Sequence, residues 1–315
     1  MHASRYATLC AVLCGIGNLL LWCGFDASVI ISEAILNSVH RRAPERIGAH
    51  DGYYGMAVTN VVFLFGNLAA PTLTSYFRGK WILTLAAAQY VLYFLSFQLI
   101  NRWVFFGASA LLGVAFSMFY AGYTGYLSEF STRATIERNS VLSWGVTSFS
   151  FVGSAIVNLA ITTMSHNSGA DSKYREYSDT EIRFFFAALG LSCCGAVAVY
   201  ASLPNKGVTD NIAANNSHST TAVEQLKVML SVLIHPRVLI LAPFYFYHGL
   251  FFVFFTSIIP TTFQFTKAIS LNVYIPAYYS FALAAGSMAS KVYFIWSVSM
   301  SFSEQYQILT TIYTR

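Results

Sequence analysis

Eight long apolar runs, separated by polar segments, dominate this sequence. A helix needs about 20 apolar residues to cross the hydrocarbon core of a bilayer. The runs are predicted to be transmembrane helices and cover residues 7–38, 55–76, 81–100, 104–128, 141–164, 183–203, 238–263 and 275–296. Alternation of apolar and polar residues with a period of two, which is typical of barrel strands, is absent from them. The chain is therefore predicted to be an all-α polytopic membrane protein.

Charged residues make up only 10% of the 315 residues, against about 25% in a typical soluble domain. This deficit excludes a water-soluble globular fold and a disordered chain. The basic residues are scattered at the ends of the apolar runs, so the expected partner is the lipid bilayer, and nucleic acid is not. The five cysteines lie inside apolar runs, where we interpret them as small buried side chains. No metal or cofactor is predicted.

The spacing of the runs predicts three parts. Residues 1–203 are expected to form a six-helix N-terminal transmembrane half, residues 204–236 a central loop, and residues 237–315 the start of a second half. This is the organisation of transporter folds built from two six-helix halves. Because only two runs follow the central loop, the second half is expected to be incomplete.

Two capping boxes mark predicted helix starts, because a Ser or Thr followed three residues later by Glu satisfies free backbone N–H groups. Ser178 and Glu181 precede the sixth run, and Thr221 and Glu224 lie in the central loop. After Thr221, apolar residues recur on one side, which predicts a short amphipathic helix on the membrane surface. Its apolar side is formed by Val223, Leu226, Leu230 and Leu233.

The first run carries a stripe of polar residues. Asn18, Asp26, Glu33 and Asn37 fall within little more than a quarter-turn of one another at about 100° per residue. An ionisable residue inside a span is costly and marks a functional site by default. We therefore expect this face to line the bundle interior or a water-filled cavity, where Asp26 and Glu33 bind a cation or proton or pair with a basic residue. In the alternative interpretation, Glu33 lies near the membrane surface and only Asp26 is buried.

Other spans carry polar residues that have two interpretations. Asn60 and Asn67 share one face of the second span and either hold helices together or line a cavity. Asn158 closes a stripe of hydroxyl residues in the fifth span, which favours close helix packing or a cavity wall. His248 in the seventh span is either a packing residue or a proton relay. The full set of candidate cavity or ion-binding residues is Asn18, Asp26, Glu33, Asn60, Asn67, Asn158 and His248.

Three further predictions follow from the sequence of the fourth span and of the loop after it. Gly113, Ser117 and Ala121 place a small residue at every fourth position, which favours a close contact with a neighbouring helix. Tyr123 and Tyr126 are interpreted as an interfacial belt. Glu129 and Arg138 are expected to be surface charges on either side of the loop.

No enzyme is predicted. The sequence contains no phosphate-binding glycine loop, no His-Glu-x-x-His zinc motif and no Gly-x-Ser-x-Gly elbow, so no catalytic residue is named.

Several short motifs, in order, resemble those of the UNC-93-like ion channel regulatory family of the major facilitator superfamily. They cover roughly residues 7–290 and comprise Glu33 and Val39, the segment 52–57, Gly66 with Asn67 and Pro71, the segment 122–127, the segment 138–140, and Trp144. The resemblance implies two six-helix halves around a central cavity and an N-terminus in the cytosol. Lys and Arg are divided almost evenly between the two sides and do not decide the orientation.

The chain departs from this pattern in two places. The loop at residues 78–80 is a shortened form of the superfamily's gate motif, and four spans of the second half are expected to be missing. The incomplete second half favours a transporter-like regulatory subunit of an ion channel or another membrane partner. Asp26 and Glu33 favour the alternative, a cation- or proton-coupled secondary transporter of a small solute or ion. A third possibility is a non-functional fragment.

Overall fold

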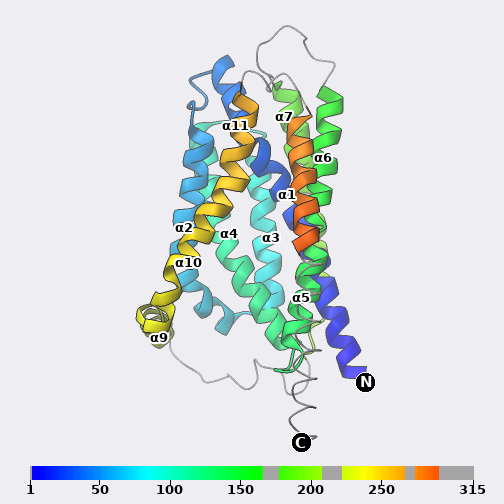
Figure 1. The fold of residues 1–315 in the computed structure, drawn as a ribbon, viewed down its shortest axis with the longest axis vertical. Coiled ribbons are helices and arrows are strands. Elements are labelled where there is room, and N and C mark those ends of the chain that lie inside the picture. The colour runs from blue at the N-terminus through cyan, green and yellow to red at the C-terminus, as the bar shows by residue number, and fades with distance from the viewer. Residues whose placement is uncertain (1, 166–176, 208–221, 267–273, 291–315) are drawn as a thin grey trace, which may run out of the picture.

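A computed structural model of the chain describes residues 2–165, 177–207, 222–266 and 274–290. This part of the chain is a bundle of long helices and contains no strand (Figure 1). The protein is thus an all-α polytopic membrane protein, as predicted. The division at residues 203 and 236 stays a prediction.

The helices follow the predicted runs closely. The first half contains α1 (His2–Arg42), α2 (Asp51–Tyr76), α3 (Gly79–Ser96), α4 (Arg102–Glu129), α5 (Ile136–Thr147), α6 (Ser150–Ser165) and α7 (Asp179–Ser202). Later elements are α9 (Ala222–Ile234), α10 (Pro236–Val253), the π-helical η1 (Phe254–Ile258) and α11 (Ile259–Phe265). Residues 275–290 form one more helix, drawn in orange beside α6 in Figure 1.

Six helical segments in the described part are long and apolar enough to cross a membrane. They are Arg5–Arg42, Asp51–Ala70, Arg102–Glu129, Ile136–Thr163, Asp179–Ser202 and Pro236–Phe263. The predicted third span, α3, has 18 residues but falls outside this set because Lys80 and Gln89 lower its hydropathy. The predicted eighth span is described only over residues 275–290.

The fifth span is broken, which corrects the prediction of one continuous helix over residues 141–164. Its two parts, α5 and α6, are separated by Ser148 and Phe149. The Thr147 and Ser148 hydroxyls donate to the carbonyls of Ser143 and Trp144, at 2.8 and 2.6 Å. Hydroxyls that bond back to their own helix in this way bend it.

Helix α1 lies at the centre of the bundle and contacts α2, α5, α6, α7 and α11. Its polar stripe faces inward, as predicted, and the core around it is rich in aromatic rings. Phe97 and Phe186 stack with ring centroids 3.6 Å apart, joining α7 to the end of α3. The hydroxyl stripe of the fifth span is also fully buried, and Ser143 approaches α1 at Gly15.

Helices α2 and α4 approach each other through small residues, as the small-residue repeat predicted. A Cβ added at Gly113 would lie 2.8 Å from the Cβ of Val62 and 3.1 Å from the backbone nitrogen of Phe63. The Ser117 hydroxyl donates to the Phe63 carbonyl at 3.2 Å. The two backbones are therefore in near contact on this face.

Three predictions about individual side chains are wrong. Tyr123 and Tyr126 are buried in the core rather than placed at the membrane interface, because their rings pack on Trp144 and Phe130. Glu129 is half-buried, and its carboxylate accepts a hydrogen bond from the backbone nitrogen of Gly79 at 3.4 Å. The cysteines are all unpaired, but Cys194 is exposed and Cys23 is only partly buried.

Ion pairs link the loops at the end of the bundle farther from the N-terminus. Asp179, at the start of α7, contacts Arg42 at 3.0 Å and Arg46 at 2.8 Å. The Arg102 guanidinium lies 3.2 Å from the buried carboxylate of Asp51. These contacts fix the loop between α1 and α2 against its neighbours.

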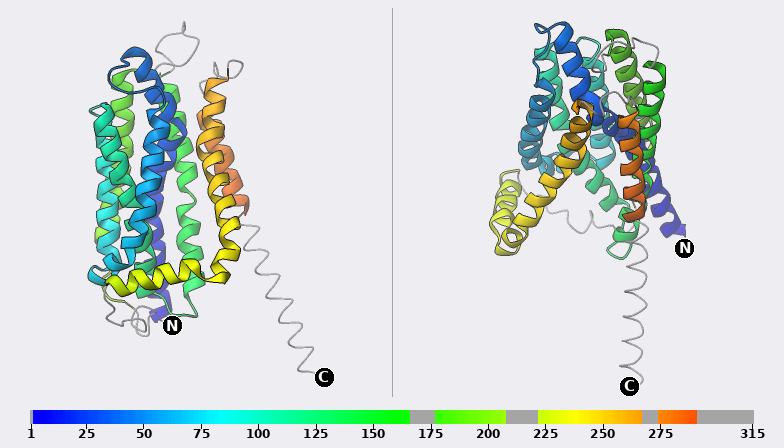
Figure 2. Two further views of the ribbon diagram at one scale, coloured as in Figure 1. Left: turned by 90° about the vertical axis from the view of Figure 1, so that its left-hand side faces the viewer. Right: turned by 45° about the horizontal axis from the view of Figure 1, so that its top comes forward.

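A helix is present at each of the two predicted helix starts. Ser178 and Glu181 form the complete capping box of α7, with bonds of 3.2 and 2.7 Å. The predicted amphipathic helix is present as α9, while Thr221 lies outside the described residues. Figure 2 shows α9 running across the end of the bundle that carries the N-terminus, which is the orientation expected of a helix on a membrane surface.

Candidate ligand-binding cavity

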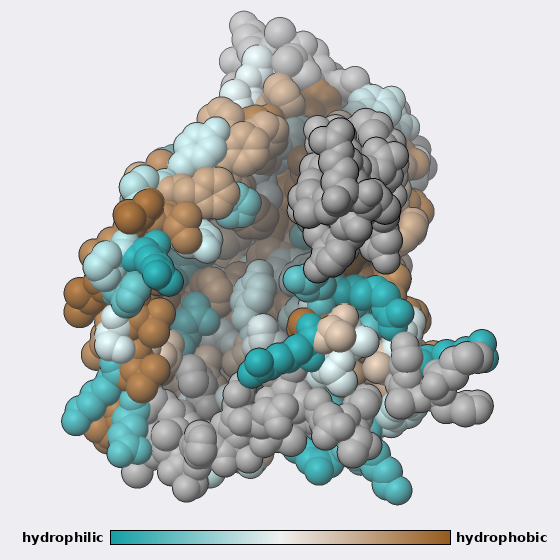
Figure 3. Space-filling view, turned by 60° about the horizontal axis from the view of Figure 1, so that its bottom comes forward, coloured by the Kyte–Doolittle hydropathy of each residue, from teal (hydrophilic) through white to brown (hydrophobic). Residues whose placement is uncertain are grey.

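A cavity of about 320 Å³ lies between the first helices and the α10–η1 segment. Its wall is formed by residues of α1, α2, α4, α6, α10, η1 and the helix over residues 275–290. In the space-filling view, the surface is hollowed at the end that carries the N-terminus (Figure 3). Small-molecule sites in proteins have volumes of about 300–1,000 Å³, so this cavity has room for a small ligand.

Seven of the eighteen described lining residues are aromatic. They are Trp22, Phe25, Phe63, Phe116, Tyr120, Phe151 and Phe252. The rings hold one another in place: Trp22 stacks on Phe116 at 6.1 Å between centroids and meets Phe25 edge-on at 5.6 Å. A wall of interlocked rings keeps its shape when a ligand enters, which lowers the entropy lost on binding.

Asp26 is the one carboxylate in the described lining of this cavity. The Ser150 hydroxyl donates to one of its oxygens at 2.9 Å. Ser150 is the first residue of α6, directly after the break in the fifth span, so the break places this hydroxyl against α1. The second oxygen has neither a hydrogen-bond nor an ion-pair partner among the described residues.

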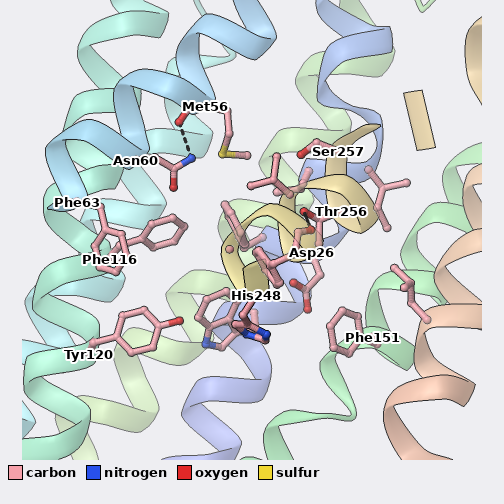
Figure 4. A pocket seen from close by; sticks show the side chains of 18 residues that line it. Asp26, Met56, Asn60, Phe63, Phe116, Tyr120, Phe151, His248, Thr256 and Ser257 are labelled. Carbon is pink, nitrogen blue, oxygen red and sulfur yellow. Dashed lines mark hydrogen bonds between the residues drawn. The ribbon is translucent and has the colours of Figure 1, made fainter. Parts of the chain in front are cut away.

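The π-helical segment η1 supplies two hydroxyl residues, Thr256 and Ser257, to the cavity (Figure 4). The backbone nitrogen of Ile259 bonds to the Phe254 carbonyl, five residues back, which is the π pattern. Pro260 has no N–H group and cannot continue the regular ladder. The Phe255 carbonyl instead accepts the Tyr279 hydroxyl from the helix over residues 275–290. Sequence reasoning missed η1, for which Pro260 was the available signal.

Three of the seven predicted site residues come together in this cavity: Asp26, Asn60 and His248. They lie on α1, α2 and α10, and the carboxylate and the imidazole occupy the same part of the cavity in Figure 4. The Asn60 amide donates to the Met56 carbonyl of its own helix at 3.0 Å. His248 is thus a cavity residue, and its ring also stacks on Phe244 with centroids 6.4 Å apart.

Asn18 and Asn158 are buried outside the cavity and join helices. The Tyr200 hydroxyl of α7 donates to the Asn18 side-chain oxygen at 2.7 Å. The Asn158 amide donates to the Ser280 hydroxyl at 3.0 Å and so ties α6 to the helix over residues 275–290. Asn67 is half-buried and lies away from the cavity lining. The Asn158 contact fits the prediction of helix packing rather than that of a cavity wall.

Glu33 occupies a separate, smaller pocket of about 40 Å³ with Tyr53, Ser257 and Thr261. Only 8% of the residue is exposed, and one carboxylate oxygen has no hydrogen-bond partner. This oxygen lies against Gly52, where any side chain would collide with it. The alternative in which only Asp26 is buried is therefore wrong, because Glu33 is buried as well, while the depth of Glu33 in the bilayer stays a prediction. No group of three or more His, Cys, Asp or Glu that could hold a metal ion occurs in the described residues.

Comparison with known proteins places this architecture in a family. A family model described as ion channel regulatory protein UNC-93 matches residues 43–312. The match confirms the resemblance to this family and extends to residue 312, past the expected end at residue 290; it begins at residue 43, after Glu33 and Val39.

Two curated proteins named UNC93-like protein MFSD11 are similar to the chain. The protein from Xenopus laevis is 24% identical over 265 residues, which cover 79% of this chain and 56% of that protein. The protein from Xenopus tropicalis is 24% identical over 150 residues, which cover 47% of this chain and 33% of that protein. The chain thus spans about half the length of the first relative and less of the second.

Proposed function

We propose that this chain, which belongs to the UNC-93 family of ion channel regulatory proteins, is a transporter-like membrane protein. Its central cavity binds a small solute or ion and moves it across the bilayer. The observation that carries this proposal is the cavity of about 320 Å³ with the unpaired Asp26 oxygen. The cavity lies between helices of the predicted first half and helices that follow the central loop. Transporter folds place their substrate in the same position, between two halves.

Uptake of a solute mixture into vesicles tests this proposal while the solute is still unidentified. Vesicles reconstituted with the chain are incubated with a mixture of small polar metabolites, and their contents are measured by mass spectrometry. We expect at least one solute to accumulate above protein-free vesicles, and Asp26→Asn to abolish that accumulation. Glu137→Gln, which neutralises an exposed carboxylate on α5, is the matched control. The proposal fails if no solute accumulates, or if uptake is unchanged by Asp26→Asn.

A second candidate function is regulation of an ion channel or another membrane protein. It is favoured by the family's description and by α10, in which no residue is fully buried. Phe246 and Tyr247 on α10 are 71% and 64% exposed and face lipid or a partner protein. If the second candidate is correct, Phe246→Ala with Tyr247→Ala reduces co-purification with a channel subunit. Phe184→Ala, at an equally exposed site on α7, leaves co-purification unchanged.

We also propose that the N-terminus is cytosolic, which places the central loop in the cytosol after six spans. The loop contains a glycosylation sequon at Asn215, outside the described residues. Absence of a glycan at Asn215 in cells is the expected result. A glycan there would contradict this orientation.

A further inference from the structure

The charge of the cavity wall restricts the class of solute. Among the described lining residues Asp26 is the single carboxylate, and neither Lys nor Arg is present. A charged side chain inside a membrane protein is costly unless an opposite charge or a proton neutralises it. An anionic solute would add a second negative charge beside Asp26, with no Lys or Arg to offset it; the His248 imidazole is the one basic side chain in the described lining. The wall therefore favours a cation.

The aromatic rings of the wall also favour a cation. The face of an aromatic ring carries a partial negative charge, and cages of such rings recognise quaternary ammonium groups. Trp22 is held by Phe25 and Phe116, and Phe63 is held by Tyr120 at 5.7 Å between centroids. All of these rings line the same cavity as Asp26, and in Figure 4 Phe63, Phe116 and Tyr120 lie on the side of the cavity opposite its carboxylate. The wall thus combines one carboxylate with several electron-rich surfaces.

The size and the hydrogen bonds of the cavity distinguish an organic cation from a bare ion and from a sugar. One water takes up about 30 Å³ in the liquid, so a lone metal ion would leave most of a 320 Å³ cavity unfilled. A sugar needs many polar partners, but the Thr256 hydroxyl and the Asn60 amide already donate to carbonyls of their own helices, at 2.8 and 3.0 Å. A small organic group with one positive charge matches both the volume and the polarity.

We infer that the central cavity binds a small organic monocation, an amine or a quaternary ammonium compound, with Asp26 as its counter-charge. This inference rests on the proposed function and names the substrate class of the same site. The geometry assigns Asp26, which the Ser150 hydroxyl holds through a hydrogen bond, to the charged end of the ligand, and the rings around Trp22 to its alkyl groups.

Binding of matched probes to the purified full chain tests the inference. Choline and tetraethylammonium are the cationic probes, and 3,3-dimethyl-1-butanol has the shape of choline without the charge. Affinity is measured from the increase in unfolding temperature during titration, because a ligand that binds the folded state stabilises it. We expect at least one cation to bind ten times or more tightly than the neutral probe. Asp26→Asn is expected to weaken cation binding by roughly ten- to a hundredfold and to leave the neutral probe unaffected.

Three further variants show whether an effect comes from the Asp26 charge, from the other α1 carboxylate or from the aromatic wall. Glu33→Gln removes the other α1 carboxylate, which lies outside the cavity, and should leave the cation preference unchanged. Asp26→Glu retains the charge and should retain the preference. Phe252→Leu removes a half-exposed ring of the wall, so it should lower cation affinity without loss of folding.

The outcomes separate this inference from the proposed function. Equal binding of the cations and the neutral probe would overturn the cation assignment while leaving a solute-binding cavity. A cation preference that survives Asp26→Asn would overturn the role of the carboxylate. If metabolite uptake occurs but neither cation binds, the solute belongs to another class. If uptake is absent as well, the proposed function itself fails.

Discussion

Because α2 and α4 approach each other closely at Gly113, we expect the substitution Gly113→Ala to lower the free energy of unfolding. The new methyl group would lie 2.8 Å from the Cβ of Val62 and 3.1 Å from the backbone nitrogen of Phe63, where ordinary contacts measure 3.4–4 Å. The Phe63 nitrogen is part of the α2 backbone and the Val62 Cβ is bonded directly to it, so neither atom can move away by a side-chain rotation. The helices must separate by several tenths of an ångström. Overpacking of this kind lowers the free energy of unfolding by about 1–3 kcal/mol.

Gly107→Ala is the matched control, because it makes the same substitution in the same helix. No atom lies within 4 Å of a Cβ at position 107. Both variants gain the higher helix propensity of Ala over Gly, about 1 kcal/mol. The difference between them therefore measures the packing at Gly113 alone.

Chemical unfolding of both variants in the same detergent, followed by circular dichroism, provides the comparison. We expect Gly107→Ala to be as stable as the parent chain or more so, and Gly113→Ala to be about 1–3 kcal/mol less stable than Gly107→Ala. Equal stabilities would refute the backbone contact between α2 and α4.

Three further substitutions test other contacts by the same unfolding assay. Tyr200→Phe removes the buried hydroxyl that donates to Asn18, so it should lower the free energy of unfolding by about 1–3 kcal/mol. Its control is Tyr247→Phe, at an exposed site, which should change the free energy of unfolding by less than about 0.5 kcal/mol. Asp179→Asn removes two ion pairs that are about one-third exposed, so we expect a loss of at most about 1 kcal/mol that shrinks in 1 M salt. Ser280→Ala leaves the buried Asn158 amide without its acceptor and should lower the free energy of unfolding by about 1–3 kcal/mol. An unchanged free energy of unfolding would mean that this hydrogen bond does not hold the helix over residues 275–290 against α6.

The helices could be predicted from the sequence because a bilayer imposes a minimum length on each apolar run. The inward face of α1 was also predictable, since Asn18, Asp26 and Glu33 recur with helical periodicity. In the structure Asn18 and Glu33 are buried, and Asp26 is half-buried at the cavity wall. The break between α5 and α6 was not foreseen. It depends on which Ser and Thr hydroxyls bond back to the backbone, and the hydroxyl stripe alone does not specify this.

The composition of the cavity was only partly predictable. Asp26 and His248 are far apart in the sequence and line one cavity only because η1 and α11, which continue α10, pack against α1, and no local pattern encodes this packing. Glu33 is close to Asp26 along the stripe, yet it lies in its own pocket against Gly52. Tyr123 and Tyr126 have the composition of an interfacial belt, and their burial depends on neighbours from other helices.

The most direct test of this account asks whether position 26 faces a water-filled cavity. The five native cysteines are replaced, and Asp26→Cys is compared with Ser28→Cys, two residues along the same helix and 1% exposed. Reactivity with a charged, membrane-impermeant thiol reagent is measured in reconstituted vesicles. The account predicts that Asp26→Cys reacts and Ser28→Cys does not. Equal reactivity at the two positions, or none at position 26, would contradict it.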